Sequence, residues 1–316
     1  MKPKFTHELD FRQERDFGQK ISATLEFISA HFRPLGRVLL YLVVPAVLLQ
    51  GLASALFDAE LFGSVQGAMR EQGLGLTGLL QGGMWGTMLS TPAYWIKTIL
   101  GTAVFTLLLL SVYGYVKLCL CPQPASGEVR VAEVWAVVRQ EFVGTFFSAW
   151  GLSFLITAGF FLLVIPGIYF SVALSLFFVV KMVEGTGFGE TLSRCLQLTS
   201  GKWWSTFGLI AIMLFIFYLV IVGIGISVTL FSGGLSAMFQ VSRLHSPVFS
   251  IMMASLNSLV LLLLLPPLLV ALAFQYFNLV ERRDGVGLRR LIDSLGQTSA
   301  PQATNSTYQP DEEGEY

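Results

Sequence analysis

Side chains that could carry out chemistry are few in this chain and lie far apart. Histidine and cysteine, the usual ligands of transition metals, occur at His7, His31, His245, Cys119, Cys121 and Cys195. Zinc and iron sites need several such side chains at short, regular spacing, and a disulfide framework needs more cysteines than these. We therefore expect no metal, no cofactor and no disulfide framework.

Other catalytic patterns are missing as well. The glycine-rich stretches at residues 73–78 and 233–236 do not stand between a strand and a helix, as phosphate loops and nucleophile elbows do. No aspartate or glutamate lies at the centre of a long apolar run, where proton relays place them. The sequence indicates no catalytic residue, so we expect a protein that is not an enzyme.

The composition is typical of a membrane protein. Hydrophobic residues make up 54% of the 316 residues and charged residues 13%, whereas charged residues are about 25% of an average soluble domain. The net charge is zero, which gives no indication of nucleic-acid binding. We expect an all-α integral membrane protein whose partners are membrane lipids and other membrane protein subunits, with no nucleic acid.

Six apolar runs are suited to transmembrane helices, which need about 20 largely apolar residues. They cover approximately residues 38–56, 96–117, 145–164, 168–181, 204–228 and 251–279. The fourth run is the shortest, and only a short link containing Pro166 and Gly167 separates it from the third. Proline and glycine favour a break there rather than one helix of nearly twice the usual length.

Lysine and arginine are strongly segregated along the chain. All of the twenty basic side chains except Arg70, Lys97 and Arg243 fall in the N-terminal segment, in alternate links between the apolar runs, or after the last run. Because basic residues stay on the cytoplasmic side, this pattern predicts a multi-pass protein of the bacterial inner membrane with both termini in the cytoplasm.

A spacing of i, i+4, i+7, i+11 precedes the first, third and fifth runs. It is formed by Ile21, Leu25, Ile28 and Phe32, by Val131, Trp135, Val138 and Phe142, and by Phe188, Leu192, Cys195 and Thr199. Each set marks one face of an amphipathic helix. Pro34, Gly144 and Gly201 follow two residues later, and we expect each to be a hinge at which the chain turns into the membrane.

The pattern predicts three parallel repeats, each an interfacial amphipathic helix followed by two spanning helices. The units cover about residues 20–119, 130–183 and 187–280, within a membrane domain at residues 20–280. A cytoplasmic segment precedes it at residues 1–19, a juxtamembrane amphipathic segment follows at 281–296, and the polar tail at 297–316 is expected to be disordered. The alternative is that ordinary interfacial linkers share the same spacing.

Aromatic and basic residues stand where the predicted helices meet the membrane surface. Trp203 and Trp204 follow Lys202 at the start of the fifth run, and Trp135 lies in the second amphipathic stripe. Tryptophan gathers at membrane interfaces and lysine faces anionic headgroups. We expect these four residues to anchor the protein at the interface; a stacking platform for a ligand is the alternative for the paired tryptophans.

The last apolar run contains the polar and helix-breaking residues that could line a substrate path. These are Asn257, Pro266, Pro267 and Gln275. Prolines free backbone carbonyls at membrane depth, but buried amides more often bind neighbouring helices. The sequence is consistent with both interpretations, a substrate path and packing between helices.

Several short segments carry a resemblance to a known family. They are Pro166 to Tyr169, Glu184, Gly189 to Leu192, Gly201 to Trp204 and Tyr276 to Leu288. With these segments the chain resembles the membrane domain named after glycerophosphoryl diester phosphodiesterase and related Bacteroidota-like proteins of unknown function. Relatives carry an arginine soon after the Pro-Gly turn, where this chain has Ser171 and Val172. The resemblance implies a membrane module without the catalytic domain.

These observations favour two functions of different classes. The first is a non-enzymatic inner-membrane protein that serves as a scaffold or subunit of a membrane complex. The second is a carrier or translocation subunit for a lipid or another hydrophobic substrate, with its path near Asn257, Pro266 and Gln275. Co-purifying proteins distinguish the first from the second, and lipid movement in reconstituted vesicles distinguishes the second from the first.

Overall fold

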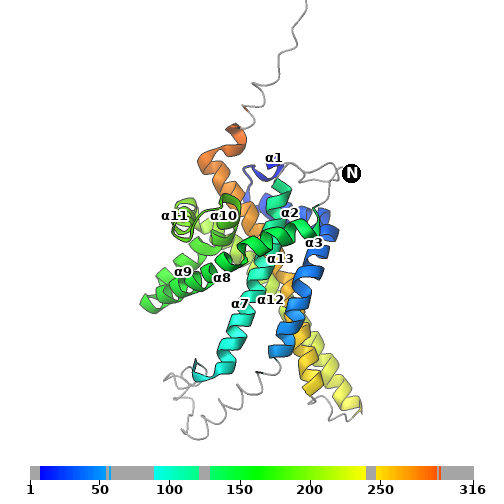
Figure 1. The fold of residues 1–316 in the computed structure, drawn as a ribbon. Helices are drawn as coiled ribbons and strands as arrows, with labels where there is room; N and C mark the ends of the chain where they lie inside the picture. Colours follow the sequence, from blue (N-terminus) through cyan, green and yellow to red (C-terminus); the bar gives the residue numbers. More distant parts are fainter. Residues whose placement is uncertain are drawn as a thin grey trace, which may run out of the picture.

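The computed structural model describes residues 8–54, 57, 89–120, 129–239, 247–289 and 292. These residues form helices joined by short links, with no strand among them (Figure 1). His7, Cys121, His245 and the tail predicted to be disordered at residues 297–316 lie outside the described residues. The prediction of an all-α protein is confirmed for the part of the chain that is described.

The helices follow one another in this order: α1 (Glu8–Phe11), α2 (Phe17–Ala30), α3 (Phe32–Val38), η1 (Leu39–Val43), α7 (Pro92–Leu120), α8 (Val131–Leu162), α9 (Val164–Ala173), η2 (Leu174–Leu176), α10 (Phe177–Glu184), α11 (Phe188–Thr199), α12 (Trp203–Phe239) and α13 (Pro247–Asp284).

Among the described residues, six helical segments are long and apolar enough to cross a membrane. They are Phe32–Ser54, Pro92–Leu120, Val131–Leu162, Val164–Glu184, Trp203–Gly223 and Leu264–Asp284. Each overlaps one of the six predicted runs, which confirms the prediction of a multi-pass membrane protein with six such helices. Because the exposed surface of these helices is itself apolar, lipid can solvate it directly.

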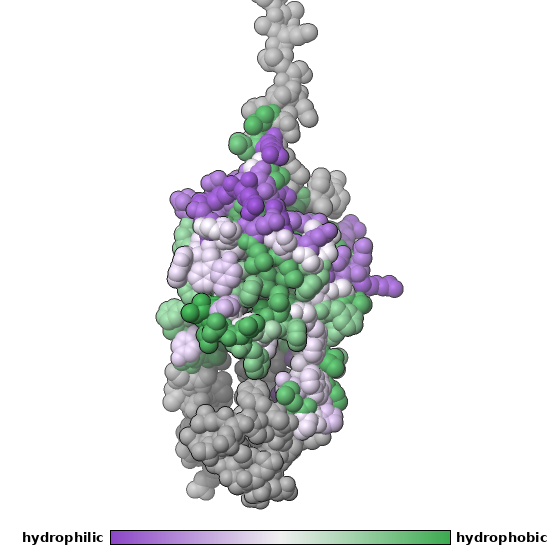
Figure 2. All heavy atoms as spheres, turned by 90° about the vertical axis from the view of Figure 1, so that its left-hand side faces the viewer, coloured by the Kyte–Doolittle hydropathy of each residue, from purple (hydrophilic) through white to green (hydrophobic). Residues whose placement is uncertain are grey.

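One end of the bundle is hydrophilic, and we call it the polar end. Figure 2 shows hydrophilic residues gathered at the top of the molecule and hydrophobic residues below them. The polar end includes α1, α2, α11 and the last turns of α13 (Figure 1). This separation fits a protein whose polar end meets water while the helices below it meet lipid.

The core lies near the polar end, where α13 packs on α2, α7 and α10. The residues of α13 from Leu269 to Val280 are all buried. Phe11 stacks on Phe274 at 5.9 Å between ring centroids and meets the edge of Phe277 at 5.7 Å. Phe27 joins this cluster from α2 at 5.8 Å from Phe11. Aromatic pairs at such distances stabilise a fold beyond their area alone, so the N-terminal segment is part of the core.

The first membrane segment begins without a hinge at Pro34. The chain turns at His31, and Pro34 is the third residue of α3. A proline is tolerated in the first turn of a helix because its missing N–H would have no partner there. The prediction that Pro34 marks the turn is therefore wrong by three residues.

Gly144 is not a hinge, and this predicted turn is wrong. α8 continues without a break from Val131 to Leu162, so the amphipathic stripe and the membrane segment form one helix. A Cβ atom at Gly144 would lie 3.5 Å from the Lys181 ammonium of the neighbouring helix, which is an ordinary van der Waals contact, so an alanine would also fit there. Glycine is frequent inside membrane helices, so its presence does not by itself predict a turn.

Gly201 lies in the turn between α11 and α12. Its φ of +77° is in the left-handed region, which glycine adopts without steric cost. The three interfacial segments thus differ: α2 and α11 are separate helices, whereas the middle one is fused to its membrane helix. The three-repeat arrangement stays a prediction.

The two glycines give a matched pair of substitutions. We expect Gly201→Ala to lower the free energy of unfolding by about 1 kcal/mol, because alanine is strained in the left-handed region. Nothing lies within 4 Å of the added methyl group at Gly201, so the backbone alone carries this cost. Gly144→Ala should be neutral or stabilising by up to about 1 kcal/mol, because alanine favours a helix. Denaturant unfolding in detergent micelles checks both; a larger loss for Gly144→Ala would contradict the continuous helix.

Candidate functional site

A buried polar cluster joins α2, α12 and α13 near the polar end, and we call it the Lys20 cluster. It consists of Lys20, Ser205, Thr206 and Gln275. The Lys20 ammonium donates to Gln275 Oε1 at 2.8 Å and to Ser205 Oγ at 3.2 Å. Gln275 Nε2 in turn donates to Thr206 Oγ1 at 2.9 Å. Gln275 and Thr206 are fully buried and Lys20 is 3% exposed, so these bonds are made away from water.

Lys20 has only neutral hydrogen-bond acceptors in this cluster. Burial, with the nearby charges of Arg282 and Lys202, lowers the pKa of Lys20 from 10.5 to about 8, although Asp16 acts in the opposite direction. Desolvation penalises the charged form of an amine, because water no longer solvates it. The folded protein therefore releases the Lys20 proton at a lower pH than the unfolded chain does.

The lowered pKa predicts a stability that depends on pH. Between about pH 8 and 10.5 the unfolded chain keeps the Lys20 proton and the folded protein does not, so the free energy of unfolding should rise with pH across this window. Lys20→Met should reduce the rise, whereas Lys202→Met, at an exposed position, should retain most of it, because Lys202 is the smallest of the contributions to the lowered pKa of Lys20. Unfolding midpoints of the three proteins across the window measure this; an unchanged rise in Lys20→Met would refute the assignment.

Arg15 ties the N-terminal segment to α13. Its backbone N–H donates to Asn278 Oδ1 at 2.8 Å, and its guanidinium donates to the carbonyls of Phe11 and Asp10. The guanidinium also lies over the Phe274 ring, 5.0 Å from the centroid, where a cation is attracted to the aromatic face. The segment before α2 is thus fixed by both hydrogen bonds and ring contacts.

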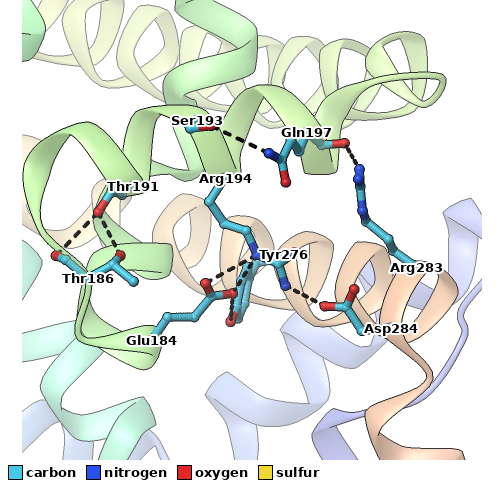
Figure 3. Close-up of polar contacts among 9 residues, drawn as sticks. All are labelled: Glu184, Thr186, Thr191, Ser193, Arg194, Gln197, Tyr276, Arg283 and Asp284. Atoms are coloured by element: carbon cyan, nitrogen blue, oxygen red, sulfur yellow. Dashed lines mark hydrogen bonds and ion pairs between the residues drawn. The ribbon is translucent and has the colours of Figure 1, made fainter.

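A second polar cluster joins α10, α11 and α13 at the polar end (Figure 3), and we call it the Arg194 cluster. It consists of Glu184, Arg194, Tyr276 and Asp284. Arg194 Nε donates to Glu184 at 3.1 Å, and its Nη2 donates to Asp284. The Tyr276 hydroxyl donates to Glu184 Oε1 at 3.0 Å. One arginine therefore links two carboxylates from the ends of two different helices.

The electrostatics of the Arg194 cluster favour the charged state. Burial acts to lower the pKa of Arg194, but hydrogen bonds from its guanidinium to Asp284 and Glu184 outweigh burial and raise it. The adjacent Cys195 is fully buried, and burial raises the pKa of its thiol to about 12. A thiol in this state is a poor nucleophile and a poor metal ligand, so Cys195 is a packing residue.

The predicted interface anchors lie at or near the surface. Trp204 is 76% exposed and Trp135 is 48% exposed, and Lys202 is exposed in the turn before α12. Trp203 is half-buried: it stacks on Tyr169 at 6.1 Å and on Phe207 at 5.2 Å, and its Nε1 donates to the Tyr169 carbonyl at 3.3 Å. Trp204, Trp135 and Lys202 are thus exposed where they could contact a membrane interface, while Trp203 packs against α9.

The residues predicted for a substrate path differ in their surroundings. Gln275 is enclosed in the Lys20 cluster, and α13 continues through Pro266, which is buried, and Pro267, which is half-buried. Asn257 lies on the same helix, and its side chain is outside the described residues. The hydrogen bonds of Gln275 favour helix packing over the path.

The described part of the chain was predicted to hold no metal site. Among those residues, no group of three or more histidine, cysteine, aspartate or glutamate side chains could hold a metal ion. A hollow of about 490 Å³ lies between the segment before α2 and α2 itself, lined by Arg15 and by acidic side chains that include Asp10, Glu14 and Glu26. No member of the Lys20 cluster is among its lining residues.

Comparison with known proteins gives no relative: no family model, no curated protein and no solved structure matches the chain. The resemblance to the glycerophosphoryl diester phosphodiesterase membrane domain therefore stays a prediction.

Sequence reasoning missed both polar clusters. Lys20 precedes Thr24, Phe27 and His31 at helical spacing, and all four are buried. The buried face of α2 is therefore offset by one residue from the predicted stripe, which begins at Ile21. Leu25 of that stripe is 61% exposed. The only sequence signal for the Lys20 cluster was a lysine at the start of this buried, partly aromatic face. Its partners could not be identified from it, because they lie 185 and 255 residues away.

Proposed function

We propose that this protein is a non-enzymatic scaffold or subunit of a complex in the bacterial inner membrane, with both termini in the cytoplasm. The proposal rests on the observation that buried polar side chains form hydrogen bonds to other segments of the same chain. Lys20, Thr206 and Gln275 bind one another, and Asn278 binds the backbone of Arg15. Their polar atoms hold helices together, which suits a rigid body that positions other molecules.

The Arg194 cluster supports the same role. It fixes the helices on either side of the α10–α11 link to the end of α13, at the end of the bundle that we assign to the cytoplasm. Removing one partner of such an ion pair is costly, because the other charge is then left without its counterion. A defined polar end, with Lys202 and Trp204 exposed beside it, would present a fixed surface to lipid headgroups and partner subunits.

The test is affinity purification of the full chain in mild detergent, from cells that express it at its native level. We expect a second membrane protein at constant stoichiometry in repeated preparations. A chain recovered alone each time would overturn the proposal. If the purified chain then moved a fluorescent lipid across vesicles faster than protein-free vesicles do, a carrier would replace it.

A further inference from the structure

The helices α8 and α9 form a hairpin, and α9 contacts the α11–α12 turn at the polar end of the bundle. Trp203, two residues after Gly201, donates from Nε1 to the carbonyl of Tyr169 at 3.3 Å, and the two rings stack at 6.1 Å. At the other end of α9, Thr199 Oγ1 donates to the carbonyl of Ala173 at 3.5 Å. α9 is therefore held along its length by the α11–α12 turn.

These contacts limit how deeply the hairpin can reach. α9 has ten residues, which at a rise of about 1.5 Å per residue make a helix of about 15 Å. The hydrocarbon core is about 30 Å thick. The helical segment continues through η2 and α10 to Glu184. Because the C-terminal end of α9 lies beside Thr199 at the polar end, only α9 extends below this level, and its ten residues take the tip about half-way across.

The orientation of the hairpin agrees with this limit. Figure 1 shows α8 and α9 slanting away from α7, with their tip between the polar end and the opposite ends of α7 and α12. Leu162–Val164 is where the chain reverses. The tip thus stays at an intermediate level of the bundle.

The tip carries only apolar side chains. Residues 160–168 read FFLLVIPGI, and Phe161, Leu162 and Ile165 are 88%, 78% and 81% exposed. A turn in water would normally carry polar residues, and exposed apolar surface of this kind marks contact with a membrane or a partner.

The backbone of the tip is compact. Leu163 is the only residue between the two helices; its N–H donates to the Gly159 carbonyl, and the Gly167 N–H donates to the Leu163 carbonyl, both at 3.2 Å. The first turn of a helix leaves backbone N–H groups without a partner in the helix. Pro166 lies in the first turn of α9 and has no N–H, so one such donor is absent. The turn therefore exposes fewer backbone donors than a loop would, as a segment in hydrocarbon requires.

The two helices meet through small residues. A Cβ atom at Gly167 would lie 2.5 Å from the Phe160 ring and 2.9 Å from the Phe160 backbone, so only glycine fits at this crossing. Close approach through glycine is the usual way in which membrane helices associate. The Phe160 ring covers this crossing, while the exposed side chains of Phe161, Leu162 and Ile165 point outward.

From these observations we infer that the α8–α9 hairpin enters and leaves the bilayer on the side of the polar end, and that its tip is solvated by lipid acyl chains near the bilayer centre. Phe147, Phe154 and Phe161, spaced by seven residues and 67–88% exposed, extend the same lipid-facing surface along α8. This inference does not depend on the proposed function.

The test places a nitroxide spin label at Ile165→Cys in the full chain, with the native cysteines replaced by alanine. The protein is reconstituted into phosphatidylethanolamine and phosphatidylglycerol vesicles. Oxygen, which concentrates in hydrocarbon, and a water-soluble nickel chelate then report the surroundings of the label. Gln140→Cys, near the polar end of α8, and Leu89→Cys, just before α7, are the matched controls at exposed positions.

We expect the label at residue 165 to show high collision with oxygen and low collision with the nickel chelate, and to lie deeper than both controls. Nickel collision as high as at residue 89 would place the tip in water on the far side and overturn the inference. Low collision with both reagents would show that protein covers the tip, which would overturn acyl chains as its partner. Leu163→Cys repeats the measurement should Ile165→Cys fold poorly.

Discussion

Replacing Gln275 by leucine is expected to lower the free energy of unfolding by about 2–4 kcal/mol. The side chain is fully buried and bonds to both Lys20 and Thr206. Without it, the Lys20 ammonium keeps only Ser205 as an acceptor in this cluster, and a buried charge that loses a partner is costly. Denaturant unfolding in detergent micelles measures the loss.

The matched control for Gln275→Leu is Gln140→Leu on α8. Gln140 is exposed, so its replacement should change the free energy of unfolding by no more than about 0.5 kcal/mol. If both variants unfolded at the same denaturant concentration as the wild type, Gln275 would not be part of the packing. The amide would then be free to contact a substrate, as the carrier hypothesis requires.

The second large effect is expected for Arg194→Met, which should lower the free energy of unfolding by about 1–3 kcal/mol. The change leaves Glu184 and Asp284, whose side chains are 22% and 30% exposed, facing each other without their shared cation. Glu184 keeps the hydroxyl of Tyr276. Unfolding followed by tryptophan fluorescence measures the loss, since Trp203 lies close to α11.

Arg139→Met is the matched control, because Arg139 is an exposed arginine on the outer face of α8. It should be within about 0.5 kcal/mol of the wild type. Arg194→Met/Asp284→Asn should recover part of the loss, because one of the two stranded charges is removed. No recovery in the double variant would mean that Arg194 acts through packing rather than through charge.

The membrane helices were predictable because their signal is local. A run of apolar residues has no alternative to burial in lipid or protein, and each of the six runs overlaps a helical segment that is long and apolar enough to cross a membrane. Length and composition, however, do not fix how a helix lies. The run at residues 168–181 covers parts of α9 and α10 and the 3-10 turn between them. Only the contacts of Tyr169 with Trp203 and of Ala173 with Thr199 show its placement.

The hinges were less predictable because proline and glycine serve more than one purpose. Gly201 adopts a positive φ that its neighbours cannot, so its turn follows from backbone chemistry. Gly144, in contrast, lies inside the continuous helix α8, at a position where an alanine would also fit. Sequence alone does not separate a glycine that bends the chain from one that simply continues a helix.

The polar clusters could not be predicted because they depend on the tertiary fold. Lys20 and Gln275 are 255 residues apart, and Arg194 and Asp284 are 90 apart. Charge and amide residues near helix ends are common in membrane proteins, and nothing in their local spacing selects these pairs. Their partners follow only once α2, α11 and α13 are packed together.

We conclude that the hydrogen bonds among Lys20, Gln275 and Thr206 hold α2, α12 and α13 in place. A double-mutant cycle between Lys20→Met and Gln275→Leu tests it most directly, because it isolates the interaction between the two side chains. We predict that the double variant loses at least about 1 kcal/mol less stability than the sum of the single variants. Effects that add to within about 0.5 kcal/mol would contradict the claim, since the two side chains would then not interact in the folded protein.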